Sequence, residues 1–316
     1  MEKEYVVGVD IGGQTTKIGI VDRRGNIIVQ TVINSKYKAD EADIFMQALC
    51  HTITELATGV GMEKIHGVGI GAPNGNYYKG TIEDAANLEW GKGKTIRLAD
   101  TVSKNLGVPV TVTNDANAAA VGEMTYGAAR GMKNFIMITL GTGVGSGIVI
   151  NGDVVYGHDG FAGELGHTCA VRDNGRACGC GKHGCLEAYA SAIGVARTAR
   201  EWLEMSKEPS ILRNMHEITS KDIYEAAVKG DKLAIDIFEY TGKMLGRSFA
   251  DFVAFSAPQA IVLFGGLARA GEFIFKPAKK EMEANLLSIW KGKVEIIPSA
   301  LKESDAAILG ASALAW

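Results

Sequence analysis

Short apolar runs separated by turn residues open the chain. Valine and isoleucine dominate these runs, and glycine-containing turns at 12–15 and 24–26 separate them. β-Branched runs bounded by turns are typical of β-strands, so the pattern predicts three consecutive strands. These strands are expected over residues 5–10, 16–21 and 27–33.

The same pattern recurs near the middle of the chain. An apolar run over 135–140 precedes the turn Gly141-Thr142-Gly143-Val144-Gly145, and a second run covers 146–150. Asn151-Gly152-Asp153 then predicts a hairpin turn. A strand–glycine turn–strand–turn–strand unit that occurs twice predicts two related α/β halves facing each other across a cleft.

Helical and apolar segments alternate over the rest of the chain. Apolar residues at helical spacing predict helices, and short continuous apolar runs predict buried strands. Further strands are expected over 66–71, 108–113, 260–264 and 294–297. Helices are expected over 42–58, within 91–106, and over 186–204, 220–229, 231–257, 272–287 and 304–314. The position of the repeat puts the boundary between the halves near 115–127.

Size and charge narrow the class of protein. The 316 residues exceed the ~250–300 at which single cores divide, so two domains are expected. The net charge of −3 gives no electrostatic footprint for nucleic acid or an anionic membrane. No apolar run reaches the ~20 residues of a membrane span, and the acidic start MEKEYVVGVD does not resemble a signal peptide. The expected location is the cytoplasm.

Three of the five cysteines lie within eight residues and predict a metal site. The cluster consists of Cys178, Cys180 and Cys185. Thiolates at this spacing, together with one imidazole, are the ligands of a Cys3His zinc site. The fourth ligand stays open among His167, His183 and Cys169, of which His167 is our choice. If protein atoms fill all four positions, the metal is structural rather than catalytic.

Two other interpretations of the cysteine cluster compete with zinc. The thiols would either form a disulfide or serve as inert small residues in a glycine-rich turn. A disulfide is disfavoured, because nothing places the chain in an oxidising compartment. The intervening glycines favour the metal, since they let the backbone turn sharply enough for neighbouring sulfurs to face one ion.

Three glycine-rich turns that follow strands predict a nucleotide site. Successive backbone N–H groups in such turns bind phosphate oxygens. The turns are Asp10-Ile11-Gly12-Gly13-Gln14-Thr15, Gly141–Gly147 and Gly265-Gly266. The 40 glycines are near twice the ~7% average share, which we attribute to backbone that approaches a ligand. Residues 93–95 resemble the end of a P-loop, but Leu88 stands where that motif needs glycine.

Asp115 is the candidate for acid–base chemistry. It follows the strand expected over 108–113 and precedes an alanine-rich helix. A purely structural role would be helix N-cap. A functional role would be general base toward a hydroxyl, because a carboxylate at the carboxyl end of a strand borders the cleft in α/β sheets.

Two amides and two further carboxylates are candidates for binding a polyol. Asn87 and Asn114 are neutral groups that can hydrogen-bond hydroxyls. Glu164 and Glu187 lie on either side of the cysteine cluster. A metal that fixes this loop would make both carboxylates immobile acceptors for sugar hydroxyls.

These motifs together resemble the ROK sugar kinases and, within that family, the bacterial glucokinases. The resemblance rests on Asp10-Ile11-Gly12-Gly13, Asn114-Asp115, Gly163-Glu164-Leu165-Gly166-His167, the cysteine cluster with Glu187, and Gly265-Gly266. It covers essentially all 316 residues. It implies the actin-like ATPase (ribonuclease H-like) α/β fold. The small domain would comprise residues 1–115 plus about 300–316, and the large domain residues 116–299.

The resemblance also assigns the site residues. Asp115 would be the catalytic base, and His167 the zinc histidine. The sugar would be held by Asn87, Asn114, Asp115, Glu164, His167 and Glu187. ATP would be held by Asp10, Gly12, Gly13, Gln14, Thr15, Gly141, Thr142, Gly143, Gly265 and Gly266. One departure is Gln14, which stands where the family usually has threonine, although Thr15 and Thr16 follow at once.

The implied activity is ATP-dependent phosphorylation of a hexose at its 6-hydroxyl. Magnesium would bridge the phosphates, with Asp10 as a candidate outer ligand. Glucose is the first choice of substrate, and N-acetylmannosamine, N-acetylglucosamine, fructose and allose are the alternatives. The family also includes sugar-responsive repressors with an N-terminal helix-turn-helix. Because the first phosphate loop begins at Asp10, we expect no room for such a DNA-binding module and therefore expect an enzyme. We also expect that this enzyme is a homodimer and acts in carbohydrate metabolism.

Overall fold

A computed structural model describes residues 3–316, which form two compact units. Unit 1 extends to Met132 and includes Asp153–Gly163 and Ala300–Trp316. Unit 2 consists of Lys133–Gly152 and Glu164–Ser299. Unit 1 therefore runs past residue 115, where we placed the domain boundary, because the helix that starts there packs on the C-terminal helix.

Unit 1 is built on a five-stranded sheet. The strand order is β3 (Ile27–Asn34), β2 (Thr15–Asp22), β1 (Tyr5–Ile11), β4 (Ile65–Gly71) and β8 (Val110–Thr113). The first three strands are antiparallel, and β4 and β8 run parallel to β1. A small second sheet contains β5 (Gly75–Asn76), β6 (Thr81–Glu83) and β7 (Thr95–Ile96). These strands of two or three residues are too short for a periodic pattern, and we did not predict them.

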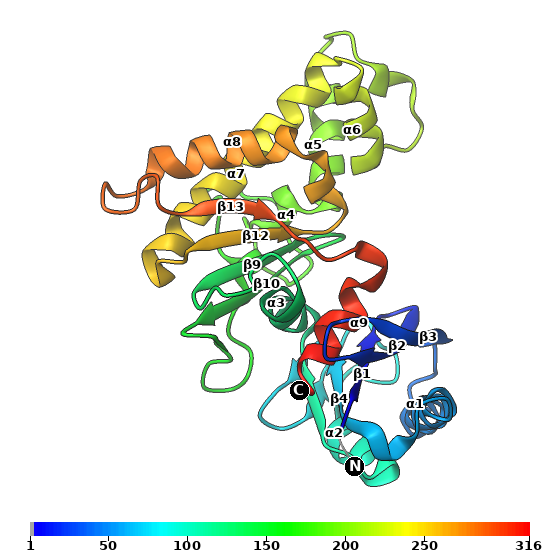
Figure 1. The fold of residues 1–316 in the computed structure, drawn as a ribbon. Helices are drawn as coiled ribbons and strands as arrows, with labels where there is room; N and C mark the ends of the chain where they lie inside the picture. The colour runs from blue at the N-terminus through cyan, green and yellow to red at the C-terminus, as the bar shows by residue number, and fades with distance from the viewer. Residues whose placement is uncertain (1–2) are drawn as a thin grey trace. The chain divides into compact units, whose positions relative to one another are not determined.

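Helices cover both faces of the unit 1 sheet, as the continuous burial of Val6–Val9 in β1 requires. Val7, Val9 and Ile11 share a core with α1 (Ala42–Ala57) and α2 (Leu98–Leu106). Val6 packs on the other face with α9 (Glu303–Ala313), which lies across the blue strands in Figure 1. On this face α9 also packs against α3 (Asp115–Tyr126). A short 3₁₀ helix, η1 (Met62–Lys64), comes directly before β4.

Unit 2 repeats this topology. Its strand order is β13 (Glu295–Pro298), β12 (Ala260–Phe264), β9 (Phe135–Leu140) and β10 (Val144–Ile150). The two residues of β11 (Asp153–Val154), which by contacts are grouped with unit 1, pair with the edge of this sheet at β10. β9 pairs antiparallel with β10 and parallel with β12, as β1 does with β2 and β4. The predicted duplication is therefore present as two sheets of the same strand order.

Long helices pack on the unit 2 sheet. The longest is α7 (Lys232–Ser256), which packs along α8 (Glu272–Asn285). Close packing is possible because a side chain at Gly242 would overlap Pro277. The remaining helical segments are η2 (Leu165–His167), α4 (Glu187–Ala190), α5 (Ala192–Met205), η3 (Ile211–Asn214), α6 (Ser220–Val228) and η4 (Gly266–Ala270). Within the described part of the chain, no helix has both the length and the apolar character needed to cross a membrane.

The single helix expected over 186–204 was wrong, because the structure has two helices there. The chain is extended at Ser191, between α4 and α5, and the Ser191 hydroxyl accepts a hydrogen bond from the Gly194 N–H. Ser191 is thus an N-cap that starts a new helix. The break fixes the direction of α4, which begins with Glu187.

Candidate functional site

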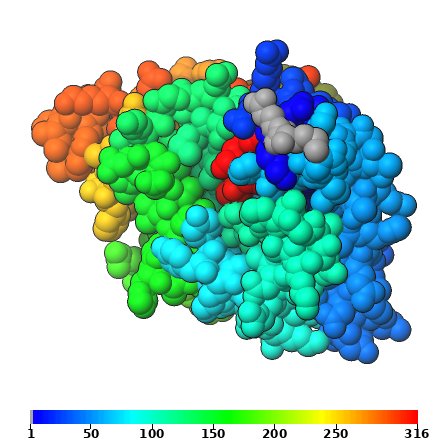
Figure 2. Space-filling model, turned by 60° about the horizontal axis from the view of Figure 1, so that its bottom comes forward, coloured from blue at the N-terminus to red at the C-terminus, as the bar shows by residue number. Residues whose placement is uncertain are grey.

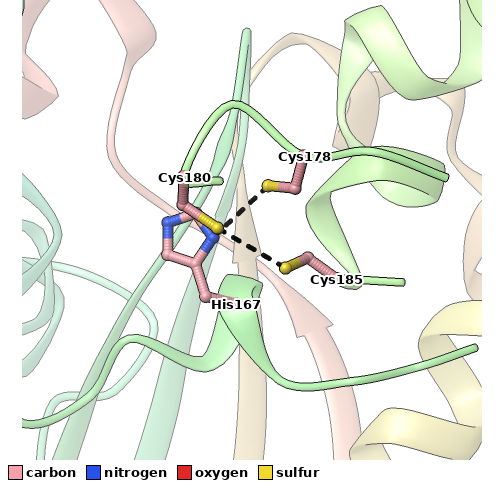
Figure 3. Close-up of side chains that lie close together, drawn as sticks. All are labelled: His167, Cys178, Cys180 and Cys185. Atoms are coloured by element: carbon pink, nitrogen blue, oxygen red, sulfur yellow. Dashed lines mark hydrogen bonds between the residues drawn. The ribbon is translucent and has the colours of Figure 1, made fainter. Parts of the chain in front are cut away.

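The ligand atoms of His167, Cys178, Cys180 and Cys185 all lie within 4.8 Å of one another. Figure 3 shows the three sulfur atoms and the imidazole gathered around one point. The Cys180 and Cys185 Sγ atoms are 3.7 Å apart, as are Cys178 Sγ and His167 Nδ1. A tetrahedral ion with metal–sulfur bonds of about 2.3 Å separates its ligands by about 3.8 Å. The donor set therefore fits a tetrahedral metal ion.

The two other interpretations of the cysteines do not match this geometry. All five cysteines are free thiols, and the separation of 3.7 Å between Cys180 and Cys185 is far longer than a disulfide of about 2.05 Å. Inert turn residues would also not be expected to bring four metal-binding atoms around one point. Among the described residues the set contains His167, and neither His183 nor Cys169 belongs to it.

Backbone turns place the sulfurs. The Cys178 N–H donates to the Lys182 carbonyl, and the Gly181 N–H donates back to the Cys178 carbonyl. Gly181 and Gly184 have φ of +87° and +76°, which only glycine adopts easily. A hydrogen bond from the Lys182 backbone N–H lowers the pKa of the Cys180 thiol, which favours the thiolate that a metal needs.

Glu187 joins the cysteine cluster to the second glycine turn. Its Oε1 accepts a hydrogen bond from Cys178 Sγ at 3.6 Å, and its Oε2 accepts from the Val144 N–H at 2.9 Å. A Cβ at Gly143 would lie 2.4 Å from the same Oε2. Gly143 is thus needed for the Glu187 carboxylate to reach the turn, a contact between distant residues that the sequence did not predict.

His167 has one side toward the cluster and the other toward a carboxylate. Its Nδ1 lies 3.7 Å from Cys178 Sγ, whereas its Nε2 lies 3.9 Å from Glu164 Oε2. The Lys182 ammonium donates to the His167 carbonyl at 2.8 Å and holds this backbone in place. Glu164, His167 and Glu187 therefore all lie on or beside the cluster within unit 2.

The glycine turns of unit 2 leave open backbone. A Cβ at Gly141 or Gly266 would meet no described atom within 4 Å. Gly265, in contrast, has φ of +103°, and a Cβ there would lie 2.6 Å from the Leu140 carbonyl oxygen. Gly265 therefore packs against the end of β9, while Gly141 and Gly266 leave space that a phosphate or a nucleoside can fill. Thr142 is exposed in the same turn.

In unit 1, Asp10 and Asp115 lie at one edge of the sheet. Asp10 is near the end of β1, and Asp115 follows β8, which runs in the same direction. Burial and the negative charge of Asp115, opposed by Lys17, together raise the pKa of Asp10 to about 6. The effect of Asp115 on Asp10 indicates that the two carboxylates are close enough to interact, which suits a shared cation.

Asp115 is not the N-cap of the helix that it begins. Solvent reaches its carboxyl group, but the surrounding protein removes hydration and raises its pKa, against a hydrogen bond of 2.8 Å from the Ala116 N–H. The N-cap of α3 is Asn114, whose Oδ1 accepts from the Asn117 N–H at 2.7 Å. The structural role that we weighed for Asp115 therefore belongs to its neighbour.

The first glycine turn lies against the loop that carries Asn87. The Gly12 N–H donates to the Thr15 carbonyl at 3.0 Å, and a Cβ at Gly13 would lie 2.8 Å from the Asn87 carbonyl oxygen. Gln14, Thr15 and Asn87 are exposed. Thr16 is not available to a ligand, because it is buried and its hydroxyl bonds the Ser35 hydroxyl at 2.7 Å. Thr15 is therefore the threonine that can compensate for Gln14.

Comparison with known proteins identifies the family, because residues 6–316 match the ROK family. The chain belongs to the ROK family. It is 36% identical to the glucokinase of Halalkalibacterium halodurans, covering 91% of this chain and 88% of the relative. It is 33% identical to the glucokinase of Thermotoga maritima, covering 99% and 98%. It is 27% identical to the xylose repressor of Bacillus subtilis, covering 98% of this chain and 76% of the repressor.

Solved structures agree with this family. A ROK family glucokinase from Streptomyces griseus in complex with glucose and AMPPNP is 33% identical, with a TM-score of 0.78 and 98% coverage of both chains. A ROK hexokinase from Thermus thermophilus is 26% identical, with a TM-score of 0.80 and coverage of 98% and 97%. The expectations of family and of fold class are confirmed.

Proposed function

We propose that this protein is an ATP-dependent hexose kinase that phosphorylates the 6-hydroxyl of glucose. The observation that carries the proposal is the interacting pair Asp10 and Asp115 at one strand edge, in a chain that resembles glucokinases over nearly its whole length. The predicted activity agrees with the names of these relatives.

Asp115 would act as the general base. As the 6-hydroxyl oxygen of the sugar bonds to the γ-phosphorus of ATP, the hydroxyl proton passes to the Asp115 carboxylate and ADP leaves. Its raised pKa favours this step, because a stronger base accepts the proton more readily. Magnesium, when bound, would neutralise phosphate charge, and Asp10 is the residue of unit 1 that would face it.

The sugar would be held by hydrogen bonds to five side chains that the sequence singled out. In unit 1 the groups are the amides of Asn87 and Asn114. In unit 2 they are the carboxylates of Glu164 and Glu187 and the imidazole of His167. Carboxylates accept hydrogen bonds from hydroxyls without donating, so they fix the direction of each sugar hydroxyl. Positioning of this kind supplies much of the rate in phosphoryl transfer.

The nucleotide would be held by backbone. The turns at Gly12-Gly13 and Gly141-Thr142-Gly143 would bind the phosphates, with Asp10, Gln14 and Thr15 at the first turn, and Gly265-Gly266 would lie on the adenosine side. The open space over Gly141 and Gly266 supports this role. Zinc is the metal that we propose for the four ligands, since Cys3His sets of tetrahedral size are typical of structural zinc.

A sugar-responsive repressor is the second candidate. A ROK family transcriptional regulator has a TM-score of 0.86 with this chain, at 26% identity and with 77% of that regulator covered. The glucokinases are more similar in sequence, at 33–36% identity, and are covered over 88–98% of their length, which favours catalysis.

The test is ADP release in a coupled assay with glucose, N-acetylmannosamine, N-acetylglucosamine, fructose and allose. We expect glucose to give the highest kcat/KM. Higher kcat/KM for another of these sugars would correct the substrate and keep the enzyme class. Binding of a sugar without any ADP release would instead support the repressor.

A further inference from the structure

Cys169 and Cys185 face each other across a short antiparallel bridge within unit 2. Cys185 belongs to the metal cluster and is buried, whereas Cys169 is an exposed thiol outside the cluster. Neither the cluster nor the proposed sugar site uses Cys169. A thiol that lies opposite a metal ligand therefore still needs an explanation.

Backbone hydrogen bonds show which kind of pair the two cysteines form. The residue after each cysteine donates its N–H to the carbonyl of the residue before the other cysteine. These bonds run from Ala170 to Gly184 at 2.8 Å and from Leu186 to Thr168 at 3.0 Å. Cys169 and Cys185 are thus a non-hydrogen-bonded pair, with Cα atoms about 4.5 Å apart and side chains on one face. Disulfides need Cα separations of about 4.4–6.8 Å, so the backbone is already spaced for one.

The present arrangement differs from a disulfide in the direction of the two sulfur atoms. Cys169 Sγ donates to the Val171 carbonyl at 3.5 Å, which is a weak hydrogen bond. Cys185 Sγ lies 3.7 Å from Cys180 Sγ, as the dashed line in Figure 3 marks. A Cβ at Gly184 would lie 3.5 Å from Cys169 Sγ, so this sulfur lies beside the residue that precedes Cys185. Rotation about the Cα–Cβ bonds can therefore join the two sulfurs without a shift of either segment.

Cys169 is also the sulfur of this pair that an oxidant reaches first. It is exposed, and the green part of the chain to which it belongs contributes to the surface in Figure 2. Cys185, in contrast, is 0% exposed. Solvent-accessible thiols that lie next to a second, resolving cysteine are typical sites of reversible oxidation.

We propose that Cys169 is an oxidation site whose disulfide with Cys185 removes one ligand from the metal cluster. A peroxide first transfers one oxygen atom to the Cys169 thiol, which becomes a sulfenic acid as the O–O bond breaks and water leaves. The Cys185 sulfur then bonds to the Cys169 sulfur, the S–O bond breaks, and a second water leaves. Two thiols and one hydrogen peroxide thus give one disulfide and two waters. Where Cys185 is a metal ligand and carries no proton, solvent supplies that proton.

The disulfide would leave His167, Cys178 and Cys180 as ligands. Loss of the fourth ligand should weaken zinc binding by at least about tenfold. Because a thiol reductant reverses a disulfide, the four-ligand set should return after reduction. The inference rests on the proposed zinc site but not on sugar phosphorylation, since the disulfide and the metal are both measured directly.

The test treats zinc-loaded wild type and zinc-loaded Cys169→Ser with hydrogen peroxide. Peptide mass mapping without reductant should find Cys169 linked to Cys185 in wild type. A chromophoric chelator, at a concentration that leaves untreated protein loaded, should take zinc from oxidised wild type and leave it in Cys169→Ser. Dithiothreitol followed by zinc should restore the metal content of wild type.

Cys50→Ser is the matched control, because Cys50 is a free thiol of unit 1 that does not belong to the pair. It should behave as wild type does in both measurements. Oxidised but unlinked Cys169, a link within the cluster instead, or equal zinc loss from Cys169→Ser would overturn the proposal. If wild type holds no zinc, the proposed metal site fails first, and the link alone then decides the oxidation site.

Discussion

At the scale of single residues, the carboxylates of Asp10 and Asp115 make the site costly to fold. Both have raised pKa values, because burial disfavours their charged forms, and for Asp10 the negative charge of Asp115 adds to this effect. An acid that is held charged against this tendency is a stronger base and a better cation ligand. Asp115 was predicted from its place after a strand, and Asp10 from the first glycine turn and the family resemblance, but only the folded sheet brings them to one edge.

Asp10→Asn should therefore stabilise the protein in a pH-dependent way. The Asp10 pKa of about 6, against 3.8 in the unfolded chain, means that the stability from this group is present below pH 3.8 and is lost as the pH rises through 6. Removing the charge should raise the free energy of unfolding by up to about 3 kcal/mol at pH 8 and hardly at pH 4. Urea unfolding at both pH values, without nucleotide, measures the difference. An equal gain in the free energy of unfolding at pH 4 and at pH 8 would contradict the raised pKa of Asp10.

Cys180→Ser tests the metal cluster. Loss of one of four ligands should remove the one zinc per chain expected by elemental analysis, and should lower the thermal midpoint. The kcat/KM for sugar should fall about 10–100-fold, because the cluster holds His167 and Glu187. The KM for ATP should rise less, through the bond from Glu187 to the Val144 N–H.

Cys169→Ser is the control for this experiment. Cys169 is an exposed thiol outside the four-residue set, so its variant should keep both zinc and activity. Metal loss in both variants would show that the ligand set is wrong. Wild-type protein that is pure and contains no stoichiometric metal would contradict the site altogether.

At the scale of elements, glycine does two different things. We attributed the excess of glycine to ligand binding, but several glycines instead let α9 pack closely. Side chains at Gly8 and Gly69 would overlap the α9 backbone, and Gly122 meets Gly310 where α3 and α9 cross. No local pattern reveals this, because α9 is about 300 residues from β1 in sequence. The interpretation was therefore wrong for these glycines, and for the glycine turns it stays a prediction.

Gly266→Val separates the two uses of glycine. The space beside Gly266 is open, so the variant should fold and should raise the KM for ATP about tenfold by blocking the backbone. Gly265→Val would not be a fair test, since its Cβ would overlap the Leu140 backbone. Gly59→Val is the control, because Gly59 is also open and lies outside the proposed nucleotide site. Unchanged ATP kinetics in folded Gly266→Val would place the nucleotide elsewhere.

At the scale of the whole molecule, the sequence predicted what repeats and missed what is unique. The doubled strand pattern led to two sheets of the same order, because short runs of apolar residues reflect burial. The break at Ser191 was missed, since apolar spacing continues across it. The bond from Glu187 to Val144 joins residues 43 positions apart, and such contacts leave no mark in local spacing.

Family resemblance supplied the roles that physical patterns left open. His167 was one of three possible fourth ligands until the resemblance singled it out, and the four side chains do lie together. The resemblance does not settle the preferred hexose in the same way, because hydroxyl contacts that many sugars share leave no distinct signature in the sequence. Only turnover can show that preference.

Phosphate transfer to glucose by wild type and by Asp115→Asn is the most direct measurement of the central claim. Glucose, ATP and magnesium are incubated with each protein, and phosphorus NMR follows the product. Wild type should form glucose 6-phosphate, and Asp115→Asn should be slower by about 10²–10⁴ with unchanged thermal stability and glucose affinity, because only proton acceptance is lost. A folded Asp115→Asn protein that makes glucose 6-phosphate at nearly the wild-type rate would contradict the account.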